Sequence, residues 1–313
     1  MRKRARTATL PLGSSDLVPG SGETGVLGGG SGLRLGILAD PHLVPDDHAT
    51  DGDMARYRSA LRRCVREGVD GLALLGDLSW SGDAASLEAG LRLAARTGLA
   101  VRAVSGNHDL GEWEDALAEA VRRVGAKNVR LATPAGEVFG GEDVRVTGLC
   151  VASDNYGYTA RSDERPDVSG WGEETVVLLS HYPMISFRER AEREGVYYGD
   201  NDLENLEEVA RPLLGRTAPT VVINGHMHMR DDCAAEQVLQ ISCAALTQPP
   251  FDLTLLDLKT GGGRISVGVE RIPVAPSPDD VRLSALSPAR LRWVFEEGMW
   301  RQAAPKPEKQ AAR

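Results

Sequence analysis

The stretch VVINGHMHMR, residues 221–230, begins as an apolar, β-branched run. Gly225 follows this run, and His226 and His228 lie one and three residues after the glycine. Such a run favours a buried strand, and Gly225 marks the point where the strand ends and the backbone can turn closely. Side chains at positions i and i+2 of an extended backbone point to the same side, so both imidazoles are expected to face one space. The pair therefore indicates a site at the end of this strand.

Strand-like apolar runs recur along the chain, and the early ones alternate with stretches of helical spacing. The strand-like runs lie at residues 33–40, 71–77, 100–106, 144–151, 175–181, 219–225, 238–242, 253–258 and 265–272. The stretches of helical spacing lie at residues 54–68, 83–98 and 113–125. This order predicts βαβ units in a parallel-leaning sheet, joined to a second, more antiparallel sheet. We therefore expect an α/β fold of two mixed sheets with helices outside.

Polar motifs follow five of these runs, in the chain order D-P-H, G-D, G-N-H-D, S-H and G-H-M-H. Ligands of open α/β sheets bind beyond the carboxyl ends of the strands, so the motifs are expected to converge on one cleft. Each motif alone is common in ordinary loops, turns and helix caps, and only their joint occurrence at strand ends favours a shared site. The side chains expected there are Asp40, His42, Asp77, Asn107, His108, Asp109, His181, His226 and His228.

The histidines are placed in a way that scattered structural residues would not produce. Five of the six lie at these strand ends, and none lies in a predicted helix. The exception is His48 in the acidic loop PDDHATDGD, which we interpret as solvated or close to a substrate.

The expected cluster offers donors that suit metal ions. Carboxylate, imidazole and amide groups without a thiolate suit divalent or trivalent ions such as Mn, Fe, Zn, Co or Ni, and not a cysteine-rich structural zinc site. The set is too large for one ion that must also hold water or substrate, whereas two ions that share one carboxylate would have four ligands each. The sequence therefore predicts two ions, held by Asp40, His42, Asp77, Asn107, His181, His226 and His228.

A pair of ions about 3.5 to 4 Å apart lowers the pKa of a bridging water and holds both oxygens of an in-line displacement at phosphorus. The expected chemistry is hydrolysis of a phosphoester by metal-activated hydroxide. His108 remains after the ligands are assigned, and a free imidazole there can stabilise developing charge or protonate the leaving oxygen. A carboxylate can set the tautomer of such a histidine, and we expect Asp109 to have this role.

The ordered motifs D-x-H, GD, GNHD, H and GHxH resemble those of the calcineurin-like metallophosphoesterases, over about residues 33–258. The resemblance implies a four-layer α/β/β/α sandwich with a binuclear metal centre. It also implies a role for each matching position, with His108 as the acid histidine. Asp40, His42 and His228 would bind one metal, Asn107, His181 and His226 would bind the other, and Asp77 would bridge the two.

The motifs that distinguish subfamilies argue against a phosphoprotein phosphatase. Protein Ser/Thr phosphatases of this superfamily follow GD with Asp-Arg-Gly and carry GNHE, whereas this chain reads GDLSWSGD and GNHD. Its length, GNHD and the SHYP stretch at residues 180–183 are more similar to the class III cyclic-nucleotide phosphodiesterase group. A phosphodiester substrate is therefore expected, with a cyclic nucleotide as one lead. The segments able to select it are residues 43–54, 152–172 and 186–202. The last two carry Arg and Tyr that can contact phosphate or stack on a base, and the alternative for each segment is a solvated loop.

Composition restricts the partners and the location. A formal net charge of −9 argues against general affinity for nucleic-acid backbones, so the expected partner is a small-molecule phosphoester, and the oligomeric state stays open. No stretch approaches the about 18 apolar residues of a membrane span, and the basic start lacks the apolar core of a secretory signal, which favours the cytoplasm. The four cysteines form no C-x-x-C pair, so reduced core thiols are expected.

The chain is expected to divide into three parts. Residues 1–32 are rich in Gly, Ser and Thr and are interpreted as a disordered leader, and residues 33–272 as the metallophosphoesterase domain. Residues 273–313 are expected to form an extension with a short helix from about Ser287 and a polar tail.

Other functions stay open. The same fold could serve a phosphomonoesterase or a nucleotide pyrophosphatase. A non-catalytic scaffold is disfavoured because none of the ligand positions is missing. A nuclease is disfavoured by the acidic balance of charge.

Overall fold

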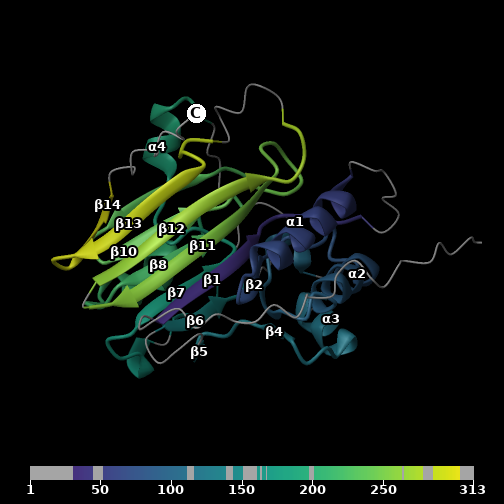
Figure 1. Cartoon of the computed structure of the whole chain (residues 1–313), viewed down its shortest axis with the longest axis horizontal. Helices are drawn as coiled ribbons and strands as arrows, with labels where there is room; N and C mark the ends of the chain where they lie inside the picture. The colour runs from purple at the N-terminus through teal and green to yellow at the C-terminus, as the bar shows by residue number, and fades with distance from the viewer. Residues whose placement is uncertain are drawn as a thin grey trace, which may run out of the picture.

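The computed structural model contains two packed sheets with helices on the outside (Figure 1). It describes residues 31–44, 52–110, 116–138, 144–150, 161–162, 164–166, 168–196, 201–262, 264–277 and 285–303. His48 and all but the end of the expected disordered leader lie outside these ranges. Within the described part of the chain, none of the helices has the length and apolar character needed to cross a membrane.

The first sheet joins a parallel half to an antiparallel half. Its strand order is β14-β13-β12-β11-β1-β2-β3-β4. The parallel half contains β1 (Ser31–Leu38), β2 (Gly71–Leu75), β3 (Ala100–Val104) and β4 (Val129–Leu131). The antiparallel half contains β11 (Asp252–Gly261), β12 (Arg264–Pro273), β13 (Arg290–Glu296) and β14 (Met299–Gln302). The carboxyl ends of β1, β2 and β3 therefore meet at one edge.

The second sheet also places parallel strand ends side by side. Its order is β5-β6-β7-β8-β10-β9, and β6, β7, β8 and β10 are parallel. The bounds are β5 (Glu137–Val138), β6 (Val144–Leu149), β7 (Thr175–Ser180), β8 (Thr220–Asn224), β9 (Asp231–Ala235) and β10 (Val238–Ser242). Ser180 of β7 pairs with Asn224 of β8, and the Gly225 N–H then donates to the His181 carbonyl at 3.1 Å. This register brings the two histidine-bearing loops together.

The helices cover the outer faces of both sheets. On the first sheet lie α1 (Asp53–Glu67), α2 (Ala84–Ala95) and α3 (Ala116–Val124), and on the second lies α5 (Leu206–Leu214). The short α4 (Arg188–Arg193) packs over the loop that follows β8 through its residue Ala191. Two short 3-10 helices are η1 (Asn107–Asp109) and η2 (Val168–Gly170).

The alternation of side chains along the strands separates the layers. On β1, Leu33, Leu35 and Ile37 face the core between the two sheets, whereas Leu72 and Leu74 of β2 face the helices. Full burial of such a side chain stabilises the fold by about 1.5–3 kcal/mol. The expected four-layer α/β/β/α sandwich is confirmed, and the four cysteines are free thiols.

The short helix expected from about Ser287 is wrong, because residues 290–302 form the hairpin of β13 and β14. Leu291, Trp293 and Phe295 alternate along β13 and pack against the core between the sheets, a period of two that suits a strand. Gly298, with φ of 78°, provides the tight turn. The first sheet therefore continues past residue 272.

Candidate metal centre

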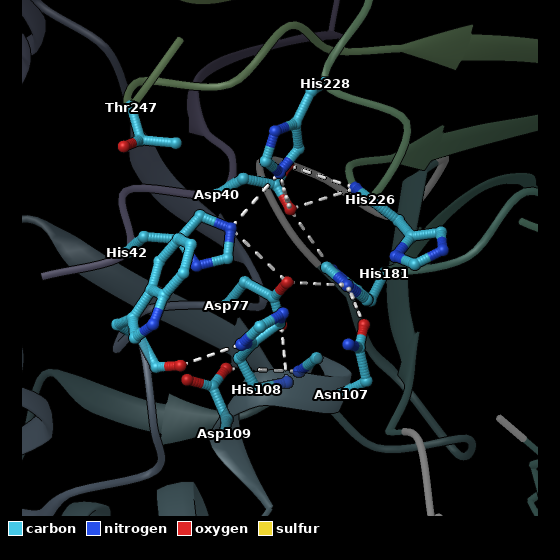
Figure 2. Close-up of polar contacts among 12 residues, drawn as sticks. Asp40, His42, Asp77, Asn107, His108, Asp109, His181, His226, His228 and Thr247 are labelled. Carbon is cyan, nitrogen blue, oxygen red and sulfur yellow. Dashed lines mark hydrogen bonds and ion pairs between the residues drawn. The ribbon is translucent and has the colours of Figure 1, made fainter. Parts of the chain in front are cut away.

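The five polar motifs meet at one edge of the sandwich (Figure 2). The D-P-H motif follows β1, the G-D motif follows β2, the G-N-H-D motif forms η1 after β3, and the S-H and G-H-M-H motifs follow β7 and β8. All nine predicted site residues are therefore brought together, as Asp40, His42, Asp77, Asn107, His108, Asp109, His181, His226 and His228.

Asp40, His42 and His228 form one group of potential ligands. Their donor atoms all lie within 4.8 Å of one another. The Nε2 atoms of His42 and His228 are 3.1 Å apart, and His228 Nε2 is 3.7 Å from Asp40 Oδ1. Asp40 and His42 are buried, while His228 is partly exposed. This group can hold one ion.

Asp77, His181 and His226 form a second group whose donor atoms also lie within 4.8 Å of one another. Asn107 adjoins it, because its Oδ1 is 3.1 Å from His181 Nε2. His181 Nδ1 lies 2.7 Å from the Leu75 carbonyl, so this nitrogen donates to the backbone and Nε2 is left to bind a metal.

Asp77 lies between the two groups. Its Oδ2 is 3.6 Å from His42 Nε2 and 3.4 Å from His181 Nε2, so one oxygen reaches a histidine of each group. Its Oδ1 accepts the backbone N–H of His108 at 2.9 Å, which fixes the orientation of the carboxylate. This is the position that a shared carboxylate requires.

The backbone at the site is in a conformation that side-chain-bearing residues rarely adopt. Five predicted ligands have φ between 44° and 64°, in the left-handed region. Such residues cost on the order of 1–3 kcal/mol each, persist only where the surrounding structure imposes them, and cluster at functional sites. The five are Asp40, His42, Asp77, His226 and His228.

Two glycines allow the loops to approach closely. A Cβ on Gly225 would lie 2.6 Å from Asp40 Oδ2, and one on Gly106 would lie 2.2 Å from Asp77 Oδ1. Any other residue at either position would displace a carboxylate of the site. The close turn expected at Gly225 is therefore present.

Burial and charge set the protonation of the site. Burial lowers the pKa of His42 to about 3 and also lowers that of His226, so both rings are neutral near pH 7 and able to bind a metal. Burial raises the pKa of Asp40 to about 6, although His228 and His181 oppose the shift. Burial alone would lower the pKa of His181, but Asp77 and Asp40 raise it to about 9. A cation bound beside the buried Asp40 carboxylate would therefore stabilise its charged form.

The donor set fits a pair of metal ions. Among the described residues, buried His226 Nε2 has no hydrogen-bond partner. The facing Nε2 atoms of His42 and His228 likewise have the separation of two ligands directed at one ion. Buried polar atoms are normally paired, so this arrangement fits the binding of positive ions by these donor atoms. Oxygen and imidazole donors without sulfur suit Mn, Fe, Zn, Co or Ni.

The structure changes the role expected for Asp109. Its two carboxylate oxygens accept the backbone N–H groups of Ser79 and Gly106, both at 3.1 Å. His108 Nδ1 instead lies 2.7 Å from the Trp80 carbonyl. The prediction that Asp109 sets the tautomer of His108 is therefore wrong, because the Trp80 carbonyl occupies that position. Asp109 ties the loop after β2 to the loop after β3.

Two further residues support the site, and neither was singled out from the sequence. The Tyr182 ring is tilted by 31° against His226 at a centroid distance of 3.9 Å, and its hydroxyl donates to Asn107 Oδ1 at 3.3 Å. The Thr247 N–H donates to the Asp40 carbonyl at 3.3 Å. The adjacency of Tyr182 to His181 in SHYP was a weak signal, whereas Thr247 belongs to no motif.

The four-layer sandwich, with Asp, His and Asn side chains gathered at its strand ends, is the arrangement expected of a metallophosphoesterase. Residues 33–230 match the family model of the calcineurin-like phosphoesterases, and the chain belongs to this family. Comparison with curated proteins finds no match.

Solved structures show the same fold at low sequence identity. A dimetal phosphatase from Danio rerio is 14% identical, with a TM-score of 0.50, over 78% of this chain and 96% of that one. A putative 5'-nucleotidase from Staphylococcus aureus is 15% identical, with a TM-score of 0.53, over 80% of this chain and 56% of that one. At such identities, the likeness shows the fold alone.

Proposed function

We propose that the chain is a dinuclear metal-dependent phosphoesterase that hydrolyses a phosphodiester. The observation that carries the proposal is the position of Asp77, whose Oδ2 faces His42 of one ligand group and His181 of the other. Membership of the calcineurin-like phosphoesterase family supports the reaction class.

In this proposal each group of ligands holds one ion, and Asp77 belongs to both. The first ion is held by Asp40, His42 and His228, and the second by Asn107, His181 and His226. The support is the clustering of donor atoms within 4.8 Å in each histidine group, together with the 3.1 Å contact of Asn107 with His181.

The ions would supply Lewis acidity toward a phosphoryl oxygen and would lower the pKa of a coordinated water. The residues of the chain supply the orientation. The Trp80 carbonyl accepts a hydrogen bond from His108 Nδ1, which leaves Nε2 of the imidazolium form to donate its proton to the leaving oxygen. Asp109 holds the two loops that carry Asp77 and Asn107 through its bonds to Ser79 and Gly106.

The test is a substrate panel with added Mn, covering cyclic nucleotides, other phosphodiesters, phosphomonoesters, nucleotide pyrophosphates, phospholipid head groups and nucleotide sugars. We expect hydrolysis of phosphodiesters, with cyclic nucleotides among the candidates. Exclusive turnover of phosphomonoesters or pyrophosphates would replace the diester assignment by one of those activities. Failure of every substrate, with no bound metal, would favour the non-catalytic scaffold.

The two histidines of GHMH should serve different ions. We expect His226→Ala and His228→Ala each to retain about one tightly bound ion per chain while lowering the affinity of a different site, because ligand loss weakens the ion it contacts most. Both variants are titrated with Mn, and electron paramagnetic resonance of the bound Mn shows which of the two sites is filled. Glu208→Ala is the control, because Glu208 lies on α5 in an exposed ion pair with Arg165 and away from the donor atoms. Identical loss profiles in the two histidine variants would contradict the assignment.

A further inference from the structure

Trp80 lies at the rim of the candidate metal centre and is exposed to solvent. Its exposed fraction is 57%, the highest among the large apolar side chains that the structure describes. The ring centroid lies 5.1 Å from that of His42 and 5.5 Å from that of His108. The indole therefore borders both a proposed metal ligand and the proposed acid.

The backbone of Trp80 is fixed, although the ring faces solvent. Its N–H donates to the Leu43 carbonyl at 3.2 Å, and its carbonyl lies 2.7 Å from His108 Nδ1. The preceding residue, Ser79, is fully buried and forms a β-bridge with Leu43. An aromatic side chain has only two χ angles, so a ring on such a backbone offers contact area at low entropic cost.

Trp80 is part of an apolar rim. Single exposed apolar residues are common and need no function. Here, however, Val44 is 41% exposed and directly follows Leu43, the backbone partner of Trp80. The other large apolar side chains that are exposed in the described residues lie on the separate elements β5, α5 and β14, as Val138, Leu214 and Met299. Two exposed apolar residues thus lie on neighbouring backbone segments beside the candidate metal centre.

We propose that Trp80 is a stacking platform for a planar aromatic group of the phosphoester substrate, either a nucleobase or an aryl ring. The proposal rests on the phosphoesterase function and names its substrate class. With the phosphate at the metal centre, the group it carries would have the indole beside it, because the Trp80 ring lies 5.1 Å from that of the proposed ligand His42. Indole stacks on any planar π system, so the contact selects an aromatic group without selecting one base.

The test measures binding by calorimetry with the full-length, metal-loaded chain. The probes are adenosine 5'-monophosphate against ribose 5-phosphate, phenyl phosphate against ethyl phosphate, and inorganic phosphate as the common reference. We expect the aromatic member of at least one pair to bind about tenfold more tightly than its non-aromatic partner, in line with base–aromatic stacking. The pair that shows the difference identifies the source as a nucleobase or an aryl ring.

Variants then assign the difference to the indole. Trp80→Ala should reduce the affinity ratio to near one without changing the binding of inorganic phosphate or the metal content, whereas Trp80→Phe should keep most of the ratio. The control is Leu214→Ala, because Leu214 is exposed on α5 and its carbonyl binds Gln237 at the opposite end of the second sheet. It should leave every affinity unchanged.

The outcomes separate this inference from the function on which it rests. If inorganic phosphate binds but both ratios are near one, or if Trp80→Ala keeps the wild-type ratio, the stacking role is overturned and the phosphoesterase function stands. If inorganic phosphate does not bind and no substrate of the panel is hydrolysed, both proposals are overturned.

Discussion

Asp77→Asn is expected to cause the largest loss of any single substitution. The side chain keeps its shape and the amide oxygen can still accept the His108 N–H, but an amide cannot present a charged oxygen to both ligand groups. The bound ions supply several kcal/mol of transition-state stabilisation, and each 1.36 kcal/mol is a factor of ten, so turnover should fall about 10³-fold or more. Metal analysis of the same sample should show fewer than two ions per chain.

The matched control is Asp257→Asn on β11 of the same sheet, whose side chain is 46% exposed and forms an ion pair with Arg34 at 3.5 Å. Exposed ion pairs contribute about 0–1 kcal/mol, so this variant should keep both its metals and its activity. Two tightly bound ions in Asp77→Asn, with activity within tenfold of the wild type, would refute the shared carboxylate.

His108→Ala is expected to lower turnover about 10²- to 10⁴-fold, the usual contribution of a general acid, while two ions stay bound. The reason is that His108 Nδ1 is engaged by the Trp80 carbonyl, which leaves the other nitrogen for a leaving oxygen. An acid matters most for a poor leaving group. The loss should therefore be large for a cyclic nucleotide and much smaller for bis-p-nitrophenyl phosphate.

The clustering of donor atoms also allows a different role, because His108 lies within 4.8 Å of His42 and Asp77 and could itself bind a metal. Metal content separates the two roles. Loss of one ion in His108→Ala, or an equal loss of turnover for both leaving groups, would show that His108 is a ligand and not the acid. His108→Gln, which keeps a polar side chain without a proton to transfer at neutral pH, provides the comparison.

The sequence was sufficient to predict which side chains gather at the site, because a residue that directly follows a predicted strand has a known place at the edge of the sheet. A polar residue after an apolar run, such as Asp77 after β2 or His181 after β7, lies at a sheet edge shared with its parallel neighbours. The partner of His108 could not be predicted, because the Trp80 carbonyl is a backbone group present at every residue. Asp109 was assigned by proximity in sequence, whereas its carboxylate turns toward backbone amides.

The C-terminal hairpin shows the same limit in the fold. Residues 290–302 contain apolar residues at spacings compatible with either a helix or a strand. The available edge of β12 decides between them, since pairing of Trp293 with Val267 places alternate side chains of β13 on the core between the sheets. The left-handed backbone conformation of residues such as Asp40 and His226 could not be predicted from the sequence either, because tertiary contacts impose it.

The most direct test of the central claim is metal analysis by mass spectrometry of the purified full-length chain, coupled to hydrolysis of bis-p-nitrophenyl phosphate with added Mn. The account predicts two ions per chain, activity that is abolished by a chelator, and recovery of that activity as the second ion rebinds. A chain without tightly bound metal that does not hydrolyse the diester at any Mn concentration would contradict it.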